Sequence, residues 1–135
     1  MPYTITPTEG FVHIAWHGVI TVQDLIQIAP DLAQMGQRLG RVPSVLHTFD
    51  GVEEIDMEPL IAYRQSLRRN DMRLPNRTKV ASVASSPTVF AYARMMEALN
   101  RNPKIEMRVF DEREPAVAWL LAGDVSTPAA DVARP

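Results

Sequence analysis

The three histidines are the first candidates for metal or acid–base chemistry, because the chain contains no cysteine. His13 and His17 would share one face of a strand at a separation of about 13 Å, too far apart to bind one metal ion. They are interpreted as surface or edge side chains. His47 lies between Leu46 and Thr48 in an apolar run. We interpret His47 as a hydrogen-bonded core histidine. The alternative is that His47 is a polar side chain lining a pocket near the strand end.

An acidic cluster follows that run. Carboxylate oxygens at such spacing could hold Ca²⁺ or Mg²⁺. The cluster lacks the regular alternation of an EF-hand loop, however, and helix-dipole complementarity explains acidic residues at a helix start. A solvated acidic loop is therefore favoured, and no metal or other cofactor is predicted. The cluster consists of Asp50, Glu53, Glu54, Asp56 and Glu58.

Ser85 and Ser86 are expected at a strand-to-helix turn, where exposed backbone N–H groups attract anions. Helix capping by Ser86 ahead of Pro87 is the commoner use of such residues. A serine nucleophile is not expected, because no G-x-S-x-G elbow is present. Since no nucleophile–base set or metal-ligand set can be assembled, we predict that the chain is not an enzyme.

Arg64 falls seven residues after Met57 and therefore inside the helical face of Met57, Leu60 and Leu67. Such an arginine usually extends its head group to water. It could instead pair with a carboxylate of the acidic loop or with an anionic ligand. The basic residues from Arg64 to Lys79 have almost no aromatic residue among them, so they indicate a solvated face and not a nucleic-acid site.

Methionine is abundant for a chain of this length. Its side chain fills irregular gaps in cores and also lines adaptable binding surfaces. Core filling is favoured, and a ligand cavity that includes Trp16, Tyr63 and Phe90 is the alternative. The methionines concerned are Met57, Met72, Met95, Met96 and Met107.

Length and composition predict one domain. The 135 residues, of which 46% are hydrophobic, are enough to bury a proper core. The formal charge of −2 gives no electrostatic reason to expect nucleic-acid binding. No apolar run approaches the roughly 18 residues of a membrane span, so no integral membrane segment is expected. The first residues lack the features of a signal peptide, which favours a cytoplasmic location.

Strands and helices are expected to alternate in the order ββαβαβαβα, which favours a mostly parallel sheet. Thr21 with Asp24, and Asp111 with Glu114, have capping-box spacing, and Gly40 is placed to end a helix. The domain is expected over residues 1–123, with a flexible tail at 124–135. The predicted strands are 3–6, 11–17, 45–49, 79–84 and 105–110; the predicted helices are 22–39, 56–71, 87–100 and one that ends before Gly123.

Four short motifs in this order resemble the SpoIIAA-like branch of the STAS superfamily, the anti-sigma-factor antagonist fold. They are the G-x-(I/L)-T start of the first helix at 18–21, FDGVEEIDMEPL at 49–60, the apolar strand at 79–84, and the ending at 109–120. The resemblance covers residues 3 to about 122. It implies a single α/β domain with a mixed, mostly parallel five-stranded sheet and four helices, related in fold to CRAL-TRIO lipid-binding domains.

The resemblance also bears on regulation. In the phosphorylated antagonists of that superfamily, the loop after the third strand ends in Asp-Ser-Ser-Gly, and a serine there accepts a phosphate. Here Met57 and Glu58 replace both serines, and Pro59 replaces the glycine. A kinase switch of the family type is therefore not expected at this loop.

Two functions remain open. The leading hypothesis is a binding module for a lipophilic small molecule with an anionic head group, near the carboxyl ends of the third and fourth strands. The alternative is a protein-interaction or regulatory domain. An apolar cavity would favour the first and a flat surface with an apolar patch the second. A homodimer is expected, because four amphipathic helices leave more apolar surface than one sheet covers. The candidate ligand-binding residues are His47, Phe49, Met57, Tyr63, Arg64, Ser85, Ser86 and Phe90.

Overall fold

The computed structural model describes residues 2–56 and 58–122. Met57 and the predicted tail at 124–135 lie outside the described residues. The elements are the strands β1 (Tyr3–Thr8), β2 (Phe11–Trp16), β3 (Gly18–Thr21), β4 (Val45–Thr48), β5 (Val52–Asp56), β6 (Thr78–Val83) and β7 (Ile105–Phe110), and the helices α1 (Val22–Leu39), α2 (Pro59–Asp71), α3 (Pro87–Leu99) and α4 (Arg113–Leu121).

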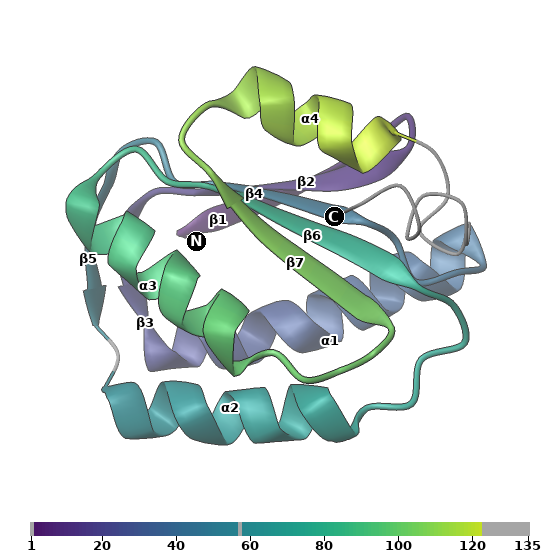
Figure 1. Ribbon diagram of the computed structural model, residues 1–135, viewed down its shortest axis with the longest axis horizontal. Helices are drawn as coiled ribbons and strands as arrows, with labels where there is room; N and C mark the ends of the chain where they lie inside the picture. The colour runs from purple at the N-terminus through teal and green to yellow at the C-terminus, as the bar shows by residue number, and fades with distance from the viewer. Residues whose placement is uncertain (1, 57, 123–135) are drawn as a thin grey trace, which may run out of the picture.

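The main sheet has five strands in the order β1-β2-β4-β6-β7. β1 pairs antiparallel with β2, and the other neighbours are parallel. Helix α4 lies on one face of this sheet, and α1, α2 and α3 lie on the other (Figure 1). This arrangement confirms the predicted fold class. None of the helices within the described ranges is long and apolar enough to cross a membrane.

Two short strands were not predicted. β3 and β5 form a separate parallel pair, in which Ile20 lies beside Ile55. The register of this pairing shifts between Gly18 and Val19, which pair with Val52 and Glu54. Because of this shift, Val52 and Ile55 pack on the same core cluster although they are three residues apart and a regular strand would turn them to opposite faces. The expected loop at 50–58 is therefore partly a strand. The helix begins at Pro59 and not at Asp56, because residues up to Asp56 are paired with β3.

Helix α1 has the predicted ends. Thr21 and Asp24 form a complete capping box, Gly40 adopts the left-handed conformation at the other end, and the helix continues through Pro30. The apolar spacing in the sequence predicts an inward stripe of Val22, Leu25, Ile26, Ala29, Leu32, Ala33, Gly36 and Leu39, and the inward residues of the structure differ from it. Leu25, Ile28, Leu32 and Met35 pack on the core, whereas Ile26 is 46% exposed. The apolar arc of α1 is wider than the surface that it covers, so one flank of the arc faces solvent.

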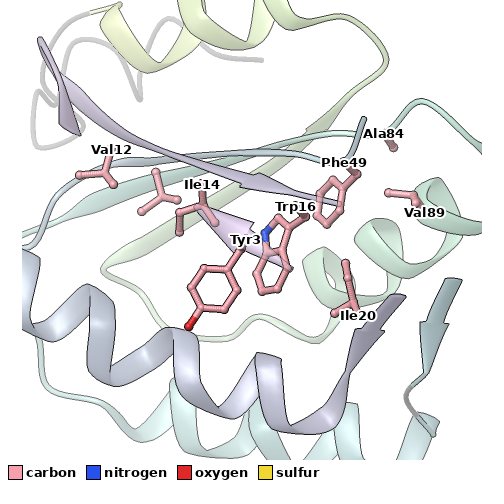
Figure 2. Packing of buried hydrophobic residues seen from close by; sticks show 9 residues of the cluster. Tyr3, Val12, Ile14, Trp16, Ile20, Phe49, Ala84 and Val89 are labelled. Carbon is pink, nitrogen blue, oxygen red and sulfur yellow. The ribbon is translucent and has the colours of Figure 1, made fainter. Parts of the chain in front are cut away.

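The larger core cluster lies between the sheet and α1. Figure 2 shows Tyr3 and Trp16 pointing from the sheet toward this helix, with Phe49 and Val89 alongside. The Tyr3 hydroxyl donates to Asp31 on α1 at 2.6 Å. A second cluster packs α4 on the opposite face through Ala116 and Leu120. Ser86 caps α3 as predicted; α4 instead begins after Glu112 with no side-chain cap bond, so the capping box predicted there is wrong.

Candidate functional site

Helix α2 has an unusual distribution of side chains. Its inward positions are small or polar, with Ala62 at 0% and Ser66 at 1% exposure. Its large apolar side chains point outward, with Leu60 at 56%, Tyr63 at 49% and Leu67 at 45% exposure. A helix that covers a core normally presents its apolar stripe to that core. The outward stripe of α2 therefore contributes little to folding and is the first candidate binding surface.

The C-terminal end of α2 is held by asparagine side chains. The Asn102 amide donates to the backbone oxygens of Arg69 at 2.7 Å and of Met72 at 3.0 Å. Asn70 donates to the Leu99 carbonyl at 3.1 Å and accepts from the Arg101 backbone at 2.7 Å. The N-terminal end has no such side-chain support, because Glu58 makes no capping bond. The helix is therefore fixed mainly at one end and against α3.

Arg69 lies on the inner side of α2. Its Nη1 contacts the Met107 Sδ atom at 3.4 Å, and its Nη2 donates to the Ser66 Oγ atom at 3.4 Å. Neither contact supplies a negative charge, and within residues 2–56 and 58–122 no carboxylate lies in salt-bridge range of Arg69. Burial lowers the pKa of this guanidinium from its ordinary value. Arg69 is thus a half-buried cation without a counter-ion on the described chain.

His47 and Tyr92 lie within the electric field of Arg69. Burial lowers the pKa of His47 to about 4, and the Arg69 and His13 charges add to the effect. Trp16 Nε1 donates to His47 Nδ1 at 2.9 Å, which places the proton of the neutral ring on Nε2. Burial likewise raises the pKa of Tyr92 to about 12, against the opposing effect of Arg69. The inner side of α2 therefore holds Arg69, His47 and Tyr92 in one neighbourhood.

The structure does not gather all the sequence-predicted candidates. Phe49 is buried in the core and stacks against Trp16, and Ser86 caps α3. Tyr63, Arg64, Ser85 and Phe90 are exposed. Met57 lies outside the described residues. Tyr63 and Arg64 are on the outer side of α2, away from His47, so a common ligand contact for all of these residues stays a prediction.

A shallow pocket lies between β5 and the start of α3. Its volume is about 150 Å³, well below the several hundred Å³ typical of sites that enclose a drug-sized ligand. Two of its lining residues, Glu53 and Glu54, are acidic. Along the described chain, no group of three or more histidine and carboxylate side chains could hold a metal ion. The pocket is lined by Val52, Glu53, Glu54, Ile55, Ser86, Thr88 and Val89.

Sequence reasoning missed Arg69 and Tyr92. A signal for Arg69 was present, since Ala62, Ser66 and Arg69 follow one another at helical spacing and form a small, polar stripe. The larger apolar residues of α2 conceal that stripe, because a stripe of large apolar side chains normally marks the buried face of a helix. Tyr92 lies on α3 at a position without any distinguishing local pattern.

Comparisons with known proteins agree with this architecture. A search of the curated proteins gives no match. Among solved structures, the chain is similar to the crystal structure of an uncharacterized protein from the DUF3478 family, with a SpoIIAA-like fold, from Shewanella loihica PV-4. The TM-score is 0.54 at 14% identity, over 87% of this chain and 91% of that chain, which shows a shared fold. The SpoIIAA-like family model matches residues 11–121, and this chain therefore belongs to the SpoIIAA-like family.

Proposed function

We propose that this chain is a non-enzymatic interaction domain that works through the outer face of α2. The observation that carries the proposal is the exposed stripe of Leu60, Tyr63 and Leu67 on a helix whose inward positions are small or polar. Met72, which follows the helix, is also exposed, at 52%. Contiguous exposed apolar side chains of this kind mark interaction sites in soluble proteins. The small pocket gives weaker support to an enclosed ligand.

The occupant that we propose for this face is a second copy of the chain. Positions 60 and 67 lie equally far from the midpoint between 63 and 64. If two α2 helices pack antiparallel about that midpoint, Leu60 faces Leu67 of the other copy, and Tyr63 faces Arg64 of the other copy. Both contacts are favourable, the second as a cation–π pair. Such self-complementarity is what a twofold interface requires.

Charge favours the same antiparallel arrangement. The segment before α2 is acidic, with Asp56 and Glu58 exposed, whereas Arg68 and Arg73 lie at or beyond its other end and are exposed. Antiparallel packing brings the acidic end of one copy beside the basic end of the other. These rim charges steer association and fix register, and salt weakens them. The dimer should therefore weaken as ionic strength rises.

Regulation in this proposal does not use the family's phosphorylated loop. Residues 50–60 contain no serine, threonine or tyrosine, so a kinase finds no acceptor there. In this proposal, protein concentration controls the dimer in place of phosphorylation. A single helix pair buries less than the roughly 1,200 Å² of a stable interface, so the dimer forms reversibly. We expect a dissociation constant of about 10–100 µM, in the range where local accumulation changes the fraction of dimer.

Sedimentation velocity over a concentration series tests the proposal. Wild type should shift from monomer to dimer, and Leu67→Arg should raise the dissociation constant at least about tenfold, because it places a cation in the apolar centre. Leu39→Arg is the matched control: Leu39 is 49% exposed but lies at the end of α1, so dimerisation should persist. A wild type that stays monomeric refutes the second copy. If it then sediments with anionic vesicles and Leu67→Arg does not, the face belongs to a lipid surface instead.

A carrier of a lipophilic small molecule is the second candidate, with one specific observation in its favour. The two buried positions of α2, Ala62 and Ser66, are small, and the helix lacks a capping bond at its N-terminus. Displacing the helix would therefore expose Met107 and the sheet at modest cost. The pocket would then grow beyond its present volume. Titration with a fluorescent fatty acid tests this candidate. Saturable binding supports it, and the absence of any binding removes it.

A further inference from the structure

We propose that Arg69, Tyr92 and His47 form an anion-binding site on the inner side of α2, for the carboxylate or phosphate group of a small molecule. This site is separate from the outer stripe, because Arg69 follows Ser66 on the buried side of the helix, where its Nη2 bonds the Ser66 hydroxyl. The inference does not depend on dimerisation. It also differs from the predicted role of Arg64, which lies on the exposed side of the same helix.

The neighbourhood has an excess of hydrogen-bond donors. A guanidinium offers five N–H groups, and Arg69 uses two of its nitrogens on a thioether sulfur and a hydroxyl at 3.4 Å. The Ser66 hydroxyl donates its own hydrogen to the Ala62 carbonyl at 3.0 Å. Its oxygen is then the oxygen acceptor that Arg69 has among these contacts, and most of the guanidinium N–H groups are left without one. His47 adds an Nε2–H group, because its Nδ1 is occupied by the Trp16 indole. An anion supplies the missing acceptors and the missing charge.

These donors are also accessible. No buried side-chain nitrogen or oxygen atom within the described residues lacks a hydrogen-bond partner. Arg69 Nε, His47 Nε2 and the Tyr92 hydroxyl have no protein partner among these residues, so each of these atoms has some contact with solvent. They are also shielded, because burial shifts the pKa values of all three side chains. Shielding strengthens an ion pair relative to bulk water, which favours an anion over water at this position.

The site has a built-in reporter. Trp16 donates to His47 and stacks near it, so a ligand that touches His47 changes the surroundings of the indole. The other tryptophan, Trp119, lies with the opposite core cluster on α4 and can be replaced in a Trp119→Phe background. The Trp16 fluorescence of that background is titrated with inorganic phosphate, acetate and dodecanoate. If only dodecanoate binds tightly, the site is assigned to a lipid carboxylate. If phosphate binds with an equal affinity, the site is assigned to free anions.

Two arginines on neighbouring helices provide the decisive comparison. Arg69→Met should weaken anion binding by about 10- to 100-fold, as expected for losing a charged hydrogen bond. Arg94→Met removes the same charge from an exposed position of α3 and should leave anion binding unchanged. If Arg69→Met does not fold, Tyr92→Phe removes only a hydroxyl and should weaken binding several-fold. No saturable binding of any of the three anions, or equal losses in the Arg94 and Arg69 variants, overturns the site. Neither result affects the outer-face proposal, which Leu67→Arg tests separately.

Discussion

Protonation of His47 should destabilise the fold in a defined pH window. Burial lowers the pKa of His47 from 6.5 to about 4. Between these two values the unfolded chain binds the proton and the folded chain does not, so the free energy of unfolding falls as the pH falls. Each pH unit of this window costs about 1.4 kcal/mol. The full contribution of His47 is therefore about 3 kcal/mol, present above pH 6.5 and lost by about pH 4.

The local geometry explains the direction of this effect. The neutral ring accepts a hydrogen bond from the Trp16 indole through Nδ1. Protonation places a hydrogen on Nδ1, and two donors then face each other in a half-buried site. The Arg69 and His13 charges oppose the new cation as well. Acidification therefore removes a hydrogen bond and adds electrostatic repulsion in the same place.

Urea unfolding at several pH values between 4 and 7 measures this contribution. The control variant is His47→Asn, whose amide oxygen can accept the Trp16 hydrogen bond but cannot be protonated in this range. His13, whose pKa is also lowered by burial, is present in both proteins, so its own burial cancels in the difference and only its repulsion of a charged His47 is retained. Wild type should lose about 3 kcal/mol more than the variant on acidification. Equal losses in both proteins would refute the assignment of a buried, neutral His47.

Two further predictions concern the ends of helices. Asn102→Ala should lower the free energy of unfolding by about 2–4 kcal/mol, because the Asn102 amide donates to the Arg69 and Met72 carbonyls. Amide hydrogen exchange should then become faster in α2 and stay unchanged in α4. Equal acceleration in both helices would contradict this local role. Ser86→Ala should lower the free energy of unfolding in urea by about 1 kcal/mol, because Ser86 Oγ accepts a hydrogen bond from the Val89 backbone. The control is Ser85→Ala, at an exposed neighbouring position without a capping bond, which should change stability by less than about 0.5 kcal/mol.

Local signals explain which parts of the fold were predictable. Thr21 with Asp24, Gly40, and Ser86 with Pro87 act within one helical turn, so they could be recognised from adjacent letters of the sequence. β3 and β5 could not, because each is stabilised by the other across more than thirty residues. The irregularity in their pairing also places Val52 and Ile55 three residues apart, which conceals the alternation expected of a strand.

The candidate site was harder to predict because α2 breaks a general rule. The spacing of Leu60 and Leu67 predicts a buried stripe, which Arg64 interrupts. In the structure Ala62 and Ser66 are buried and the leucines are exposed. Tertiary contacts through Asn70 and Asn102 decide this orientation, and both residues bond to backbone atoms far away in the sequence. Within α2 itself, only the small and polar stripe of Ala62, Ser66 and Arg69 indicates this orientation.

Site-directed cross-linking tests the central claim most directly, since the chain contains no cysteine and single-cysteine variants report without background. Arg64→Cys places a thiol beside the proposed twofold axis, and Arg94→Cys places one on an exposed position of α3 as the control. A bis-maleimide spanning about 8–10 Å matches the spacing of packed helices. We predict efficient dimer formation for Arg64→Cys, its loss when Leu67→Arg is added, and little cross-linking of Arg94→Cys. Equal cross-linking at positions 64 and 94, or none at position 64, would contradict an interaction through the outer face of α2.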